Sequence, residues 1–244
     1  MGYKHMPAVS FSGTGFLYPY QIGCAEYIKD TFEQENLFIG CISGGFTAAL
    51  SILFDITPMQ HYELLEDAKH FWSKRRLGPF LNSTSNWIAP YLKMMTKHGV
   101  SLEQINGHGL LTLGCTSLVP YKYLNVDYFY SIDHLAYMIS CSQRLFPFYR
   151  TIGLIDKKLI VDGVFSQRFA IPKLVSRKET IKVSPFRLLL PDVSPKGQTV
   201  KYLKKVYTPP DHTTYFNLVE QGYLDAQKAN DKFLSRGFKY RSKP

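Results

Sequence analysis

Apolar and polar positions along the chain follow two alternating patterns. Short apolar runs predict strands over residues 7–12, 36–43, 110–115, 121–130, 151–155, 159–161 and 180–190. Helically spaced apolar residues predict helices over 19–32, 46–54, 58–76, 87–98, 133–143 and 215–235. Helices interleaved with strands favour an α/β fold, and neither a repeat nor a disordered linker divides the chain. We therefore expect a single domain over residues 1–244.

One predicted strand-to-helix turn carries a candidate nucleophile. The apolar run ends at Ser43, Gly44 and Gly45 follow, and a helix begins at Phe46. A strand, a sharp turn and a helix can lift a serine hydroxyl out of the backbone as a nucleophile elbow. Cys41 stands where the usual Gly-x-Ser-x-Gly pattern has its first glycine. An ordinary turn with a glycine pair is the alternative interpretation.

Two further turns contain candidate functional residues. Gly13, Thr14 and Gly15 lie between a strand and a helix, where backbone N–H groups can bind an anion. A Gly-x-Gly after a strand also starts a dinucleotide fingerprint, but Tyr18 replaces its third glycine. Asp162 ends another apolar strand, so it is either a base or a turn residue.

Taken in order, these segments resemble the patatin-like phospholipase family and its animal-type branch. Five segments carry the resemblance: residues 10–17 with 20–23, 42–45, 140–147, 161–163 with Pro172, and 220–226. In the same order, they are similar to five features of that family. These are the oxyanion loop, the nucleophile elbow, a small-residue segment before Phe-Pro, the Asp-Gly-Gly motif and a segment that follows this motif. The resemblance extends over nearly the whole chain. It implies a three-layer α/β/α fold with a mainly parallel central sheet.

The resemblance also implies a serine lipid acyl hydrolase with a Ser–Asp dyad. Ser43 would attack an ester carbonyl, and Asp162 would accept the serine proton. The N–H groups of Gly13, Thr14 and Gly15 would stabilise the oxyanion. The other implied site residues are the glycines of the elbow and of the dyad motif: Gly44, Gly45 and Gly163. The substrate would be a phospholipid or glyceride, and neither a cofactor nor a metal is expected.

Three positions depart from the family pattern. Cys41 replaces the first glycine of the elbow, Val164 replaces the second glycine of Asp-Gly-Gly, and Tyr18 replaces the glycine that closes the oxyanion loop. No reacting group is lost, but we expect all three side chains to add bulk near the site. Slow turnover, an altered acyl preference and a catalytically silent lipid-binding role therefore stay open.

Charge is concentrated in the last part of the chain. The 244 residues have a formal net charge of +10. Residues 173–244 contain 15 Lys/Arg and 6 Asp/Glu, which leaves +9 in this region. Such a basic surface suits an anionic membrane or a nucleic acid, and solubility is the simpler explanation. Trp72 lies among Lys and Arg residues near the end of a predicted helix. This combination is typical of a membrane-interface anchor, and a half-buried helix end is the alternative interpretation.

Cysteine spacing and hydropathy favour a cytoplasmic protein. Four cysteines without C-x-x-C spacing predict free thiols and no zinc site. The first six residues are polar and predict no signal peptide, and no run approaches the roughly 18 apolar residues of a membrane span. We expect peripheral contact with an anionic membrane or lipid droplet and no nucleic-acid partner.

A serine hydrolase with a histidine is the other enzymatic interpretation. A Ser-Asp-His triad would run in the chain order Ser43, Asp162, His212, because His212 is the only histidine after Asp162. Replacement of His212 by Ala distinguishes the triad from the dyad. A silent lipid-binding protein would show no labelling of Ser43 by a fluorophosphonate.

Overall fold

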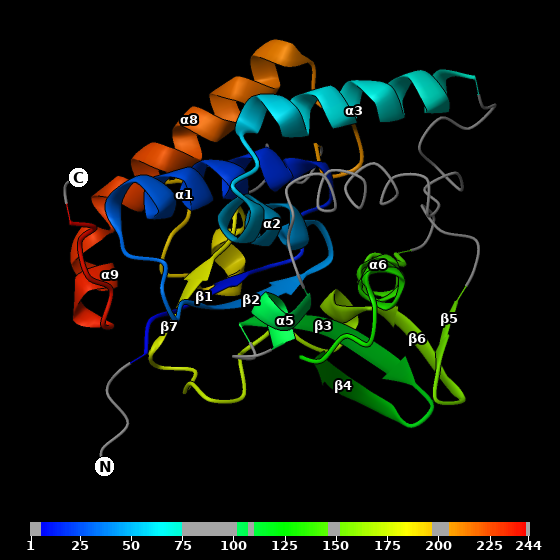
Figure 1. Cartoon of the computed structure of the whole chain (residues 1–244). Helices are drawn as coiled ribbons and strands as arrows, with labels where there is room; N and C mark the ends of the chain where they lie inside the picture. The colour runs from blue at the N-terminus through cyan, green and yellow to red at the C-terminus, as the bar shows by residue number, and fades with distance from the viewer. Residues whose placement is uncertain (1–5, 75–101, 107–109, 146–151, 197–204, 243–244) are drawn as a thin grey trace.

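The computed structural model describes residues 6–74, 102–106, 110–145, 152–196 and 205–242 (Figure 1). Its strands are β1 Ala8–Phe11, β2 Phe38–Ile42, β3 Leu111–Leu118, β4 Tyr121–Val126, β5 Gly153–Ile155, β6 Lys158–Asp162 and β7 Thr180–Val183. Its α-helices are α1 Tyr18–Thr31, α2 Phe46–Phe54, α3 Pro58–Ser73, α5 Leu102–Asn106, α6 Ile132–Ser142, α8 His212–Lys228 and α9 Asn230–Ser235. Short 3-10 turns are η1 Gly15–Leu17, η2 Ser43–Gly45, η4 Gly163–Phe165 and η5 Arg187–Leu189.

The strands form one mixed sheet in the order β5-β6-β3-β2-β1-β7, with β4 paired to β3. Strands β7, β1, β2 and β3 are mutually parallel, whereas β4 and β6 run antiparallel to β3. Parallel strands joined by helices bury their faces, which explains why β1 and β2 are buried along their whole length. A mostly parallel sheet flanked by helices confirms the expected α/β fold class (Figure 1).

Two glycines bring the last long helix close to the first. A Cβ on Gly23 of α1 would overlap the Val219 carbonyl of α8, and a Cβ on Gly222 would overlap the Tyr20 carbonyl. The Cys24 thiol then reaches the Gly222 carbonyl at 3.2 Å. Segment 220–226 therefore fastens α8 onto the helix that follows the glycine loop, and Figure 1 shows the two helices side by side.

Some boundaries differ from the sequence predictions. The strand predicted over 180–190 ends at Val183, because the chain turns through η5 between Pro185 and Pro191. The helix predicted over 215–235 begins at His212, where Asp211 accepts the Thr214 N–H at 2.7 Å, and is interrupted at Ala229. The helix predicted over 87–98 lies outside the described residues.

Three further sequence expectations concern membrane-spanning helices, the cysteines and the number of domains. In the described ranges, no helix is both long and apolar enough to cross a membrane. All four cysteines are buried free thiols, as their spacing predicted. A single domain over residues 1–244 stays a prediction.

Candidate active site

Strand pairing brings Ser43 and Asp162 to the same place in the sheet. β4 pairs with β3 from Leu113 to Leu118, so it occupies one edge of β3 over this length. β2 and β6 must therefore share the other edge. β2 ends there with Ile42 opposite Gly114, and β6 ends with Asp162 opposite Cys115, the next residue of β3. The two strands thus meet end to end (Figure 1), and Ser43 follows β2 at the position where β6 finishes.

Ser43 has the backbone geometry of a nucleophile elbow. Its φ is +51°, in the left-handed region that a non-glycine residue rarely adopts. The Ser142 hydroxyl accepts the Ser43 N–H at 3.0 Å and donates to the Gly114 carbonyl at 2.7 Å. The last residue of α6 therefore fixes the turn to β3.

The elbow glycines are required by their close neighbours. A Cβ on Gly44 would lie 2.7 Å from Thr14 Oγ1 and 2.9 Å from the Gly15 carbonyl oxygen. A Cβ on Gly45 would lie 2.7 Å from the Phe11 carbonyl oxygen. The two glycine turns therefore pack directly against each other.

The loop of Gly13, Thr14 and Gly15 offers backbone donors beside the serine. A Cβ built on Gly13 would lie 3.3 Å from Ser43 Cβ, so the loop adjoins the candidate nucleophile. Within the described part of the chain, no hydrogen bond from these three N–H groups is present. Gly15 has φ +54°, which glycine tolerates. Unpaired N–H groups next to a serine hydroxyl are suited to stabilising an oxyanion.

Asp162 is a fully buried carboxylate held by its own turn. Its Oδ1 accepts the Val164 N–H at 2.9 Å, and its N–H donates to the Arg144 carbonyl at 3.3 Å. Burial raises the pKa of Asp162 to about 7, while the Val164 N–H and the Ser43 hydroxyl oppose this rise. Among the described residues, Oδ1 accepts from Val164 N–H, Oδ2 has no partner, and no hydrogen bond of standard geometry joins the Ser43 hydroxyl to the carboxylate. Such looser contacts are common before substrate binds.

Gly163 allows the aspartate strand to approach its neighbours. A Cβ at this position would lie 2.5 Å from the Gly114 carbonyl oxygen and 2.9 Å from Ile42 Cγ2. Thr116 adds a further support, because its hydroxyl donates to the Asp162 carbonyl at 2.7 Å.

The three departures from the family pattern lie in different surroundings. Cys41 is fully buried in the main hydrophobic core, and burial raises the pKa of its thiol far above the usual range. Tyr18 packs against Tyr215 in a separate cluster, with ring centroids 6.2 Å apart. Val164 is different, because a Cβ on Gly13 would overlap its Cγ1. The Val164 side chain therefore lies directly against the loop of residues 13–15.

The histidine of the alternative triad lies on another helix. His212 begins α8, where its ring packs on Tyr62 and Phe216 with centroids 5.1 and 4.7 Å away. Among the described residues, no hydrogen bond joins His212 to Ser43 or Asp162.

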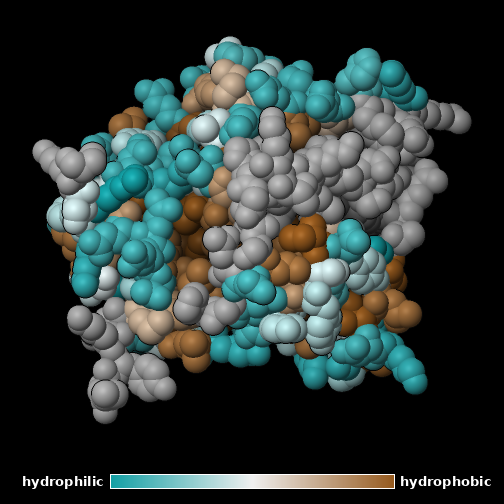
Figure 2. All heavy atoms as spheres, in the orientation of Figure 1, coloured by the Kyte–Doolittle hydropathy of each residue, from teal (hydrophilic) through white to brown (hydrophobic). Residues whose placement is uncertain are grey.

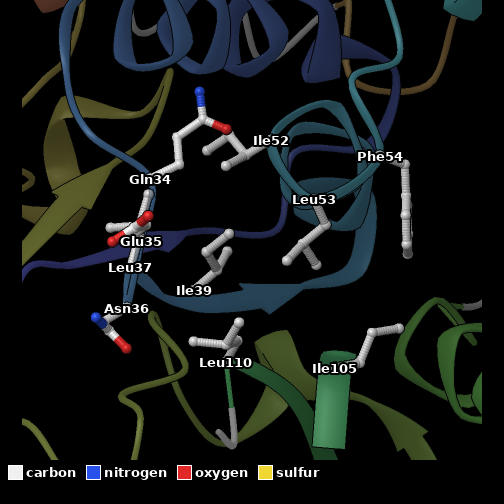
Figure 3. Close-up of a pocket in the computed structure, with 10 residues that line it drawn as sticks. All are labelled: Gln34, Glu35, Asn36, Leu37, Ile39, Ile52, Leu53, Phe54, Ile105 and Leu110. Atoms are coloured by element: carbon white, nitrogen blue, oxygen red, sulfur yellow. The ribbon is translucent and has the colours of Figure 1, made fainter. Parts of the chain in front are cut away.

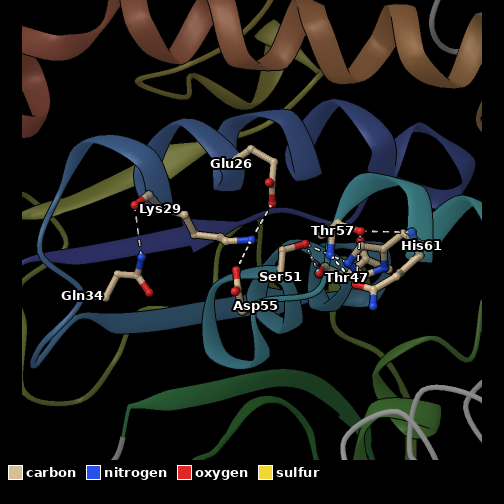
Figure 4. Close-up of polar contacts among 9 residues, drawn as sticks. Glu26, Lys29, Gln34, Thr47, Ser51, Asp55, Thr57 and His61 are labelled. Carbon is tan, nitrogen blue, oxygen red and sulfur yellow. Dashed lines mark hydrogen bonds and ion pairs between the residues drawn. The ribbon is translucent and has the colours of Figure 1, made fainter. Parts of the chain in front are cut away.

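A second serine–histidine pair has a structural role. Ser51 Oγ lies 2.8 Å from His61 Nε2, and both residues are fully buried (Figure 4). Burial lowers the pKa of His61 to about 3, so the ring is neutral. Nearby, Lys29 bridges Glu26 and Asp55 at 3.0 and 2.8 Å. This network fastens α1, α2 and α3 together.

A pocket of about 580 Å³ lies at the opposite end of β2 (Figure 3). Its lining includes Leu37, which immediately precedes β2, Ile39 near the start of that strand, and Ile52 and Leu53 of α2. Ser43 follows the other end of β2. The pocket is therefore separate from the candidate dyad.

Sequence reasoning missed the residues that support the dyad. Ser142 hydrogen-bonds the Ser43 N–H and the Arg144 carbonyl accepts the Asp162 N–H, and in the sequence both residues belong to the small-residue segment over 140–147. That segment was the available signal, but it does not indicate which hydroxyl faces the elbow. The described residues hold no cluster of side chains suited to a metal ion.

Comparison with known proteins shows a similar fold at low sequence identity. No protein-family model matches the chain, and no curated protein sequence matches it significantly. The structure is similar to the crystal structure of VipD from Legionella pneumophila, with a TM-score of 0.50 and 14% sequence identity. The similarity covers 95% of this chain and 67% of that chain. It shows a shared fold, consistent with a patatin-like α/β/α arrangement.

Proposed function

We propose that the protein is a serine acyl hydrolase that cleaves lipid esters with Ser43 and Asp162. The observation that carries this proposal is the meeting of β2 and β6 on one edge of β3, which sets the two residues beside each other. The strained turn at Ser43 and the unpaired N–H groups of the glycine loop support the proposal, because acyl transfer needs a positioned nucleophile and donors for the oxyanion.

The chemistry would proceed through an acyl-serine. Ser43 Oγ attacks the ester carbonyl, and its proton passes to the Asp162 carboxylate. The N–H groups of residues 13–15 bind the oxyanion, which collapses as the protonated Asp162 gives its proton to the leaving alcohol. Water then transfers a proton to Asp162 and attacks the acyl-serine, which releases a fatty acid and restores Ser43. A pKa of about 7 suits Asp162 to both proton transfers.

The substrate would be a phospholipid or glyceride presented at a surface. The basic region 173–244 is proposed to attract an anionic membrane or lipid droplet. Binding to anionic vesicles should exceed binding to neutral ones at low salt. Equal binding would contradict a role for charge.

Hydrolysis of phospholipids and neutral glycerides by defined variants tests the proposal. Ser43→Ala should abolish both hydrolysis and fluorophosphonate labelling. Asp162→Ala should slow hydrolysis by about 10²–10⁴-fold, the usual contribution of a general base. His212→Ala is the matched control and should retain full activity, whereas its inactivity would favour a triad.

A catalytically silent lipid-binding protein is the second candidate. The contact of Val164 with the oxyanion loop favours it, as does the burial of Ser43, whose exposed fraction is 7%. This alternative predicts that wild-type protein binds lipid vesicles without fluorophosphonate labelling of Ser43.

A further inference from the structure

Exposed apolar side chains form a continuous strip across the outer strands. We define the apolar strip as Leu154 of β5, Leu159 of β6, Tyr121 of β4, and Val164 and Phe165 of η4. Their exposed fractions lie between 41% and 62%. Figure 2 shows hydrophobic surface gathered over the region of β5 and β6.

Strand register makes the strip continuous. Leu154 pairs with Leu159, and the pairing of Ser117 with Ile160 sets Leu159 next to Leu118. Leu118 in turn pairs with Tyr121. Paired residues of antiparallel strands project from the same face, so these side chains are neighbours.

The strip continues to the candidate nucleophile. The Tyr121 hydroxyl donates to the Phe165 carbonyl, which links β4 to η4. Val164, the preceding residue, lies against Gly13, and Gly13 adjoins Ser43. An apolar path therefore leads from the ends of the two hairpins to the site of the proposed chemistry.

Charge beside the strip favours an anionic lipid surface. Lys157 is exposed in the turn before Leu159, whereas Lys122 and Lys158 are strand neighbours of Tyr121 and Leu159 and therefore project from the opposite face of the sheet. Asp156 is the acidic residue of the same hairpin turns, so the net charge there is +2, three lysines against one aspartate. Because β4, among the described strands, pairs only with β3 and lies at an edge of the sheet, the long Lys122 side chain can reach round that edge to lipid headgroups while the strip faces the acyl chains.

The outer edge of the sheet is less suited to pairing with another protein strand. Tyr137 of α6 covers β5, because its hydroxyl accepts the Leu154 N–H at 2.9 Å and donates to the Leu154 carbonyl at 3.1 Å. Both backbone groups that a new strand would use at this position are occupied. A lipid surface needs only the exposed side chains.

We infer that the apolar strip docks the protein onto an anionic lipid bilayer and directs an acyl chain toward Ser43. Leu154 and Leu159 enter the acyl region, while Lys122 and Lys157 contact headgroup phosphates. The inference rests on the proposed function for its substrate, but the docking step can be measured without catalysis.

Sedimentation with vesicles of phosphatidylcholine and phosphatidylserine tests the docking step. Leu154→Ser and Leu159→Ser should each lower the partition constant by about tenfold, as expected for removing one leucine contact from lipid. Leu174→Ser is the matched control. Leu174 has an exposed fraction of 69%, and its neighbour Val175 packs on Ala8 and Phe38 where β1 and β2 begin, away from β5 and β6.

Each outcome has a definite meaning. Strip variants should hydrolyse vesicle lipid more slowly and a water-soluble short-chain ester at the wild-type rate. The inference would be overturned if the strip variants bound vesicles with the wild-type partition constant. It would also be overturned if Leu174→Ser lowered the partition constant as much as the strip variants do. A strip-dependent dimer in solution would overturn it too, because the strip would then be a protein interface. Strip-dependent binding without any Ser43-dependent hydrolysis would reject the proposed function and leave the docking surface standing.

Discussion

Replacing Asp162 by Asn should make the protein more stable at neutral pH while it removes activity. Asp162 is fully buried, and burial raises its pKa from 3.8 to about 7. Between these two values the folded state holds a proton that the unfolded state has lost. Stability must therefore decrease as the pH rises through this window. Below about pH 4 both states are protonated and this loss disappears.

The magnitude follows from the width of the window. About three pH units separate the two pKa values, and each unit corresponds to about 1.36 kcal/mol, so ionised Asp162 costs the fold about 4 kcal/mol at pH 8. Asn is neutral at every pH, and its carbonyl oxygen can keep the hydrogen bond from Val164 N–H. The free energy of unfolding of Asp162→Asn should exceed that of the wild type by up to about 4 kcal/mol at pH 8. At pH 4 the difference should be less than about 1 kcal/mol.

Urea unfolding at pH 4, 6 and 8, followed by circular dichroism, measures this difference. Asp156→Asn is the control, because Asp156 lies exposed in the β5–β6 turn and its replacement should change stability by less than about 0.5 kcal/mol. Wild-type kcat/KM should also rise with an apparent pKa near 7, because the base must be ionised. A stability gap that is the same at pH 4 and pH 8 would refute the reasoning.

Two further substitutions test the supports of the dyad. Ser142→Ala removes the partner of the Ser43 N–H and of the Gly114 carbonyl, so unfolding free energy should fall by about 1–3 kcal/mol and kcat should decrease. Ser140→Ala, two residues earlier, should retain wild-type kcat, and equal loss in both would indicate a general effect on α6. Gly13→Ala should inactivate the protein, because its Cβ would overlap Val164 Cγ1, and Val164→Gly should restore much of the activity. A double variant as inactive as Gly13→Ala would show that this overlap is not the cause.

Local turns were the most predictable part of the candidate site. Ser43 and its two glycines are adjacent in sequence, and the structure gives Ser43 the strained φ that such a turn requires. The turn at residues 13–15 was predictable for the same reason. Backbone conformation at a tight turn depends mainly on the residues in the turn itself.

Side-chain surroundings could not be predicted in the same way. We expected Cys41, Tyr18 and Val164 all to add bulk near the site. Cys41 is fully buried in the main hydrophobic core, because both faces of β2 are covered, and Tyr18 packs against Tyr215 of α8. Which of three substitutions contacts a loop depends on packing between elements that are distant in sequence.

The pairing of Ser43 with Asp162 is the least local feature of the site. β3 is eight residues long, and β2 pairs with its first half while β6 pairs with its second half on the same edge. No periodicity within β2 or β6 indicates this shared edge, and only the motif resemblance linked the two residues. The arrangement also explains why both strands stop where they do. Extending β2 by one residue would place its backbone where Asp162 now pairs with Cys115. The end of β6 therefore limits where β2 can place Ser43, and the end of β2 limits where β6 can place Asp162.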